Sequence, residues 1–281
     1  MELRNIVLPS RVEKTTKTDD AVCGKFVIQP LERGFGVTLG SALRRVLISS
    51  IEGVAVWAIR FDGVLHELST IPGIMEDMPE IILNLKKVVF KLNDPEAAEA
   101  VCKLEVKSKG EVNAGMIETP ALVEVVNKDL TLFNLKENKT IRIELLLKVG
   151  RGYIVASQHE LTEDDPQLIP VDSMFSPVVN VTYKIDDQRV GHRTDYDKLT
   201  IDVTTNGTID PETAIINAAE LLIVHFGYLK SFSEPKDEPA PTMDLRMNQL
   251  KKRLNRSVEE LELSVRSSNC LKASNIKTLG E

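Results

Sequence analysis

The segment from residue 206 to 229 constrains the fold most, because it joins a clear helix start to more apolar residues than one helix face requires. Asn206 opens a turn with the glycine after it, Asp210 suits the N-cap position, and Pro211 suits the first helical position. The residues from 214 onward are apolar on nearly every side of the helix. One buried face needs only about three or four apolar residues in two turns, so the surplus predicts a second buried face. We expect another subunit to cover it; the alternative is a central core helix wrapped by its own chain.

A second helix is expected in the segment 31–50, which combines glycines, an apolar stripe and two arginines. The apolar residues recur with the spacing of one helical face, at Leu39, Ala42, Leu43, Val46 and Leu47. We therefore expect a helix that begins near Thr38. Arg44 and Arg45 flank the stripe and Ile48 points away from it, so this helix should contact several neighbours.

The glycines of this segment also invite comparison with phosphate-binding loops. Such loops use a glycine-rich turn before a helix to present backbone N–H groups to an anion. Here Gly34, Gly36 and Gly40 are spaced one residue away from the dinucleotide-binding pattern, and Gly40 would lie inside the helix. No Gly-Lys-Ser/Thr sequence follows. A nucleotide site is therefore the weaker interpretation.

Period-2 patterns and one further helix complete the expected framework. Apolar and polar residues alternate, as in strands with one buried face, over 141–149, 178–185 and 199–205. After a proline–glycine turn, the apolar residues of 78–85 predict a short helix capped by Glu76 or Asp77. The expected fold class is mixed α+β.

Composition and isolated side chains argue against catalysis and against nucleic-acid binding by the protein as a whole. Aromatic residues make up only 5% and the formal net charge is −7, which disfavours a base-stacking platform and an overall basic surface. The three cysteines contain no Cys-x-x-Cys pair, so free thiols are expected. Metal-ligand spacing is absent from the four histidines, His66, His159, His192 and His225. The acidic run 163–166 is expected to be solvated, and we expect no active site, metal or cofactor in this protein.

The two ends of the sequence predict its location and its domain organisation. The N-terminus has no apolar signal core and no apolar run is long enough to cross a bilayer, so we expect a cytoplasmic protein without a membrane partner. Residues 234–243 are rich in proline and charge, which predicts a flexible linker. From residue 242 on, eight Lys/Arg outnumber five Asp/Glu, so the charge reverses after the linker.

Five blocks of residues are similar, in order along the sequence, to motifs of the bacterial RNA polymerase α-subunit family. They are 31–45, 63–67 with 76–77 and 83–86, 150–153, 193–199 and 206–212. The resemblance implies a dimerisation domain of antiparallel sheet plus helices, formed by residues 1–52 and 179–233. It also implies a large, mostly-β insert domain at 53–178 and a subunit that is itself non-catalytic.

The resemblance also implies partners and the residues that meet them. In that family the α dimer starts assembly, with one protomer anchoring the β subunit and the other β′; here the second protomer could be identical or a divergent α. The implied dimer interface includes Leu39, Leu43, Val46, Leu47, Ile215, Leu222 and Phe226. Arg45 matches an arginine tied to β binding, and matches to β′-binding positions are Lys86, Val171 and Lys198.

The resemblance continues into the tail, 244–281. Block 261–272 is similar to the start of the family's C-terminal domain, which contacts promoter DNA and activators; the DNA-contacting positions match Arg266, Asn269 and Lys272. Because the later helices of that domain are absent from the sequence, we expect an incomplete, truncated helical tail with weak DNA binding. Three alternatives stay open: a nucleotide-binding enzyme, a free-standing DNA-binding regulator, and a dimeric assembly or regulatory scaffold outside the core polymerase.

Overall fold

The computed structural model describes residues 7–9, 11–15, 21–64, 67–93, 97–159, 167–190 and 193–230. Residues up to Phe226 belong to one compact unit, and of the second unit, 227–281, only the last residues of a helix are described. The predicted linker, 234–243, and tail, 244–281, lie outside the described residues, as does the acidic run 163–166.

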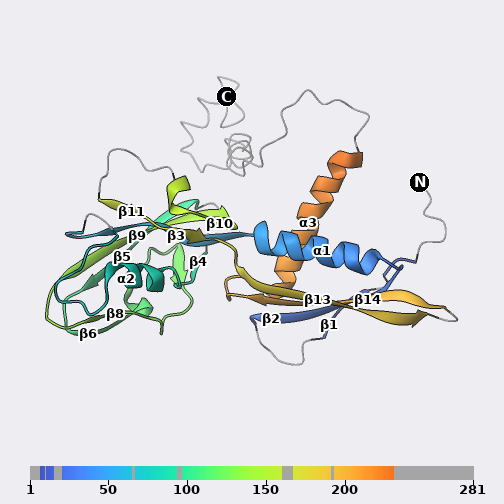
Figure 1. The fold of residues 1–281 in the computed structure, drawn as a ribbon, viewed down its shortest axis with the longest axis horizontal. Helices are drawn as coiled ribbons and strands as arrows, with labels where there is room; N and C mark the ends of the chain where they lie inside the picture. Colours follow the sequence, from blue (N-terminus) through green and yellow to red (C-terminus); the bar gives the residue numbers. More distant parts are fainter. Residues whose placement is uncertain are drawn as a thin grey trace, which may run out of the picture. The chain divides into compact units, whose positions relative to one another are not determined.

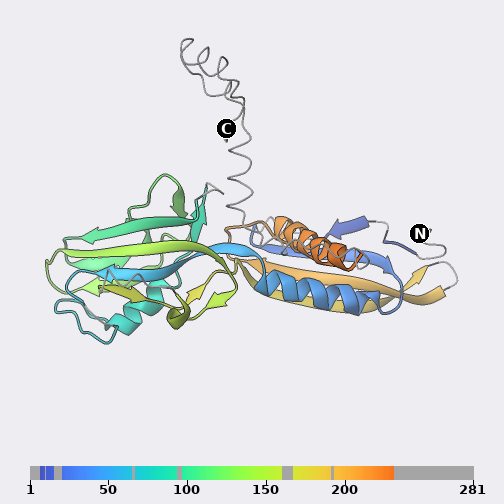
Figure 2. The same ribbon diagram turned by 90° about the horizontal axis from the view of Figure 1, so that it is seen from above.

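One part of the first unit is a four-stranded antiparallel sheet, hereafter the first sheet, covered by two helices. Its strands lie in the order β1 (Arg11–Lys14), β2 (Cys23–Leu31), β14 (Arg193–Thr205) and β13 (Val178–Val190). The helices α1 (Phe35–Ser49) and α3 (Pro211–Lys230) lie on the same face of this sheet, as Figure 1 and Figure 2 show. Alternate strand residues on that face, including Val181, Leu199 and Ile201, share one buried core with the helices.

The other part holds a second four-stranded antiparallel sheet and a larger core. The strand order is β11 (Leu168–Pro170), β3 (Glu52–Phe61), β9 (Ile141–Arg151) and β5 (Glu99–Val106). The helix α2 (Met78–Leu85) belongs to this part and contributes to its core. Two short helical turns, η1 (Ala114–Met116) and η2 (Ala156–Gln158), also belong to it. Three strand pairs complete it: β4 (Phe90–Leu92) with β7 (Val123–Val125), β6 (Gly110–Asn113) with β8 (Thr131–Leu135), and β10 (Tyr153–Ile154) with β12 (Ser173–Met174).

The α+β class and most of the expected elements are confirmed. The helix α2 occupies the expected range with Asp77 at its N-cap, and strands β9, β13 and β14 contain the expected ones but extend further. The start of α1 was predicted wrongly: the helix begins at Phe35 rather than near Thr38, because its first turn is capped by a side chain from another strand. The predicted domain limits stay predictions.

Candidate functional site

The helix α3 is anchored to the first sheet from its start to Leu222. Asp210 caps it as expected, since the Glu212 N–H donates to the Asp210 carboxylate at 3.1 Å. Ala214 and Ala218 are buried, and their small side chains bring the helix close to the strands. The predicted interface residues Ile215 and Leu222 are partly buried against this same core.

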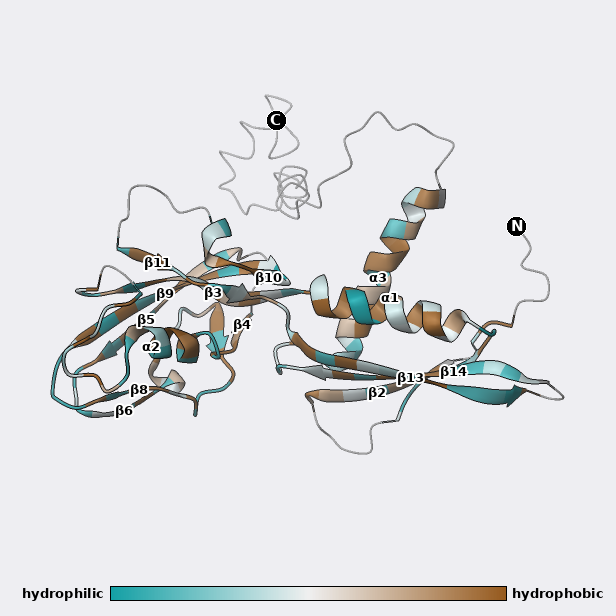
Figure 3. Ribbon diagram, in the orientation of Figure 1, coloured by the Kyte–Doolittle hydropathy of each residue, from teal (hydrophilic) through white to brown (hydrophobic). Residues whose placement is uncertain are grey.

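The helix α3 also presents apolar side chains, most of them beyond Leu222, that the described residues do not cover. Ile223 is 69% exposed and Phe226 is 59% exposed. We call Ile216, Ile223, Val224 and Phe226 the exposed apolar face of α3; Tyr228 and Leu229 continue it. Figure 3 shows hydrophobic residues along the length of this helix. The described residues therefore do not bury this surface, as the prediction of a second buried face requires, and whether another subunit covers it stays a prediction.

The apolar stripe of α1 divides into a buried part and a half-buried flank. Leu47 has 0% exposure and Leu43 is also buried, both in the core beneath α1. The prediction that Leu47 lines a subunit interface needs correction, because a side chain without exposed surface cannot contact a second subunit; for Leu43, 7% exposed, the assignment stays a prediction. Leu39 and Val46 are only partly buried, and their assignment to an interface stays a prediction.

The outward side of α1 carries the two arginines and Ile48. All three are exposed, as the helical spacing predicts. Neither guanidinium group makes an ion pair or a hydrogen bond with the part of the protein that the structure describes. Arg45 and Arg44 are therefore available to carboxylate or carbonyl groups of another molecule.

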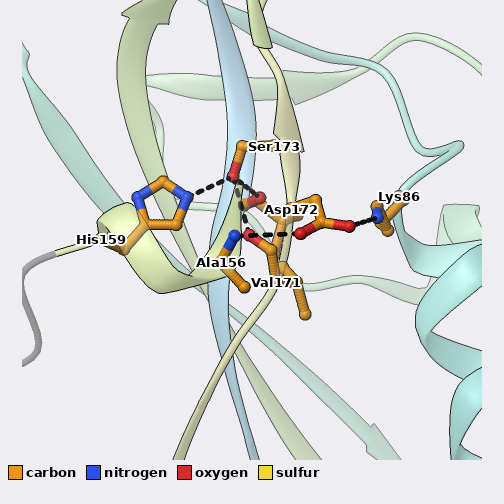
Figure 4. Close-up of polar contacts among 7 residues, drawn as sticks. Lys86, Ala156, His159, Val171, Asp172 and Ser173 are labelled. Carbon is orange, nitrogen blue, oxygen red and sulfur yellow. Dashed lines mark hydrogen bonds and ion pairs between the residues drawn. The ribbon is translucent and has the colours of Figure 1, made fainter. Parts of the chain in front are cut away.

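A cluster of polar contacts surrounds Lys86, just after α2, and is shown in Figure 4. The Lys86 ammonium donates to one carboxylate oxygen of Asp172 at 3.1 Å, and the Ala156 N–H donates to the other oxygen at 2.9 Å. The Ala156 N–H and then the ammonium group, with a smaller contribution from the Tyr153 hydroxyl, lower the pKa of Asp172. Partial desolvation and the Asp172 charge raise the pKa of Tyr153 in turn. Asp172 thus ties three segments of the protein together.

Val171 lies beside this cluster, but its side chain points into the core. It is 4% exposed, and its backbone N–H donates to the Trp57 carbonyl at 2.9 Å. Val171 therefore offers a partner little surface and its direct contact stays a prediction, whereas Asp172, the next residue, is the group at the surface. Sequence reasoning missed Asp172 because a single aspartate after an apolar residue carries no signal of its own.

His159 and Ser173 form the buried side of the cluster. The Ser173 hydroxyl donates to the Val56 carbonyl at 2.8 Å and lies 3.1 Å from His159 Nε2. If the hydroxyl hydrogen points to the carbonyl, the imidazole Nε2–H is the donor to Ser173. Burial, and then the charge of Lys148, lower the pKa of His159, which favours the neutral ring. His159 is thus a core histidine with a hydrogen-bonded ring nitrogen, as expected.

A groove of about 290 Å³ opens next to Lys86 and Asp172. Its other walls are mainly apolar, with Val54, Val88 and the exposed Met174 and Val179 among them. Lys198 lies elsewhere, half-buried on β14, and takes no part in the Lys86 contacts. The structure therefore brings Lys86 and residue 171 together but not Lys198.

The remaining expectations concern metals, thiols and the tail. The described residues contain no group of three His, Cys, Asp or Glu side chains able to hold a metal ion. Cys23 and Cys102 are free thiols, and burial raises the pKa of Cys102 to about 11. Within the described ranges, no helix is long and apolar enough to span a membrane. The predicted DNA contacts, Arg266, Asn269 and Lys272, lie outside those ranges.

Comparison with known proteins gives consistent matches along the sequence. Residues 59–176 match the model of the RNA polymerase Rpb3/RpoA insert domain, and residues 246–281 match the model of the C-terminal domain of the bacterial RNA polymerase α subunit. The DNA-directed RNA polymerase subunit α of Syntrophomonas wolfei is 47% identical over 275 residues, and that of Symbiobacterium thermophilum is 43% identical over 271. The Clostridium botulinum subunit is 42% identical over 270 residues. Each match covers 96% of this protein and 85% of the relative, so the protein belongs to the family of bacterial DNA-directed RNA polymerase α subunits.

Proposed function

We propose that this protein dimerises through α3 and the half-buried flank of α1, and that the dimer is the platform on which the large polymerase subunits assemble. The observation that carries the proposal is the exposed apolar face of α3, with Ile223 and Phe226 more than half exposed in a member of this family. Packing against the α3 of a second protomer would remove these apolar side chains from water, which is favourable. An identical protomer is the simplest partner, and a divergent α subunit is the alternative.

Two further surfaces fit contacts with the large subunits. Arg45, unpaired within the described residues and close to the exposed Ile48, suits an anchoring contact with β. For β′, Lys86 with Asp172 offers a pair of opposite charges beside an apolar groove, and Lys198 offers a separate positive charge. In this proposal the subunit has no catalytic group and no cofactor of its own, and it works in the cytoplasm, where the bacterial chromosome is transcribed.

The C-terminal part would add contacts with promoter DNA and activators. The match of residues 246–281 to the family's C-terminal domain supports this role. Arg266, with Asn269 and Lys272, would supply the DNA contacts, and a narrow A·T-rich minor groove would attract the arginine.

Co-purification tests the assembly role. We would express the tagged protein with its own β and β′ subunits and capture it, comparing wild type with the double variant Ile223→Asp, Phe226→Asp. The wild type should retain both large subunits and the variant should lose them. Met116→Asp, which places the same charge at another exposed apolar position, serves as the control. A wild-type dimer that retains neither large subunit would contradict the proposal and favour a scaffold outside the polymerase.

A further inference from the structure

Asp197, on β14, supplies the cap of a helix that begins more than 160 residues earlier. Its carboxylate oxygen Oδ2 accepts hydrogen bonds from the Gly34 N–H at 2.9 Å and from the Gly36 N–H at 3.1 Å. The residue is 7% exposed, and its bond to Gly36 is buried while its bond to Gly34 is part-buried. The anion that this glycine-rich turn binds is therefore the Asp197 carboxylate of the same protein.

The first turn of α1 has no other source of negative charge. The first N–H groups of a helix lack partners inside it, and the helix dipole makes that end positive. Gly34, at the N-cap, has no side chain, and the first turn contains no acidic residue. Asp197 thus provides both the missing hydrogen-bond acceptor and the opposite charge.

The pairing of β2 with β14 places the carboxylate there. Leu31, the last residue of β2, pairs with Asp197, and the register shifts between this pair and the next, Leu199 with Ile28. Only two residues separate Leu31 from Gly34, so the backbone turns back directly over the carboxylate. A Cβ on Gly36 would lie 3.0 Å from Asp197 Oδ2 and 3.2 Å from Asp197 Cβ, a crowded approach that favours glycine.

The two halves of α1 are held to the sheet by different means. Leu43 and Leu47 anchor the second half through buried apolar surface. The first half presents Gly36 and Gly40 to the strands, and glycine offers almost no apolar surface to bury. Leu39 adds partly buried apolar surface there, and at the first turn itself the Asp197 carboxylate supplies the anchor.

We propose that Asp197 is a positioning residue that keeps the outward side of α1 straight and fixed for its partner. That side is an exposed stripe with the spacing i, i+4, i+7, i+11, at Val37, Ser41, Arg44 and Ile48, and it runs through both halves of the helix. A partner can bind the whole stripe only if both halves stay on the sheet. This inference rests on the proposed contact between α1 and the β subunit.

The test is chemical rescue of Asp197→Ala by formate in the full-length protein. Removing the carboxylate should speed hydrogen exchange of residues 34–40 and weaken retention of β by about five- to tenfold, the size of a lost helix cap. The dimer should persist, because α3 is unchanged. Formate at tens of millimolar should restore both properties by replacing the missing anion, and chloride at equal ionic strength should not.

Two matched variants complete the experiment. Asp197→Asn keeps an oxygen acceptor without the charge and should be intermediate; it also keeps the test valid if Asp197→Ala fails to fold. Asp202→Ala removes another β14 carboxylate, one that pairs with Lys25 at 3.5 Å, and should change neither property and show no response to formate.

Three outcomes would overturn the inference. They are unchanged exchange in Asp197→Ala, normal retention of β by that variant, and a failure of formate to restore both properties. If the wild-type protein retained no β at all, the proposed function would fail instead, and the exchange and formate measurements would still decide whether Asp197 anchors α1.

Discussion

The ammonium group of Lys86 lies 3.1 Å from a carboxylate oxygen of Asp172, which joins the end of α2 to the segment between β11 and β12. Neither sequence position predicts the other, since they are 86 positions apart. The pair places one positive and one negative charge side by side at the groove proposed for β′. Its exposure, 27% for the lysine side chain and 39% for the aspartate, limits what it adds to stability.

We expect Asp172→Asn to lower the free energy of unfolding at pH 7 by less than about 1 kcal/mol, because the pair is partly exposed. The pKa of Asp172 is lower in the folded protein than in the unfolded one. Its contribution is therefore present above the unfolded pKa, about 4, and is lost as the pH falls through the folded value. Urea unfolding of both proteins at several pH values should give curves that converge at acid pH. A gap that widens on acidification would contradict this assignment.

His159 is a base where Asp172 is an acid, but its contribution to stability should likewise be lost as the pH falls. Its folded pKa lies below the ordinary value, so the unfolded protein takes up the proton first as the pH falls below about 6.5. The stability from neutral His159 is complete above that pH and is lost on acidification. His159→Ala should cost about 1–3 kcal/mol at pH 7, because Ser173 loses a buried donor.

His159→Gln is the matched control, since its amide keeps an N–H donor for Ser173 but cannot titrate. NMR titration of the His159 imidazole in the wild type, and urea unfolding of the wild type and both variants from about pH 5 to about pH 8, test this assignment. An ordinary pKa for His159 would show that the ring is not held neutral. So would a glutamine variant that loses as much stability on acidification as the wild type.

Arg45→Ala should separate assembly from folding. The side chain has no ion pair with the described residues, so unfolding should change by no more than about 0.5 kcal/mol and the dimer should remain. Retention of β in reconstitution should weaken by about 2–5 kcal/mol, as for a buried charged contact at an interface. Lys136→Ala, which removes an exposed positive charge outside α1, is the control for charge alone. Loss of the dimer in Arg45→Ala would mean that this arginine faces the other protomer.

The elements that the sequence predicts well are those whose signals are local. Asp210 and Pro211 mark the start of α3 within one turn, and the Asp210 side chain makes the expected bond. Alternation along β9 likewise reports which side chains enter the core. Local hydrogen bonding and burial decide these elements, so a short window of sequence contains the necessary information.

The elements that sequence reasoning misplaced depend on distant partners. The start of α1 is set by Asp197, which no window around Phe35 contains. The helical stripe correctly groups Leu43 and Leu47 with their neighbours, but periodicity does not distinguish a face buried in its own core from one buried by a second subunit. Val171 and Asp172 show the same limit, because only the packing reveals which of two adjacent residues reaches the surface.

Sedimentation equilibrium tests most directly whether the exposed apolar face of α3 joins two protomers. We predict that the wild-type protein has twice the 31.3 kDa mass of one protomer. The double variant Ile223→Asp, Phe226→Asp should be a folded monomer, because burying two unpaired charges costs several kcal/mol, on the order of the interface itself. Leu47→Ala, which opens a cavity in the core, should unfold more easily by about 2–5 kcal/mol yet stay dimeric. A monomeric wild type, or a double variant that stays dimeric, would contradict the account.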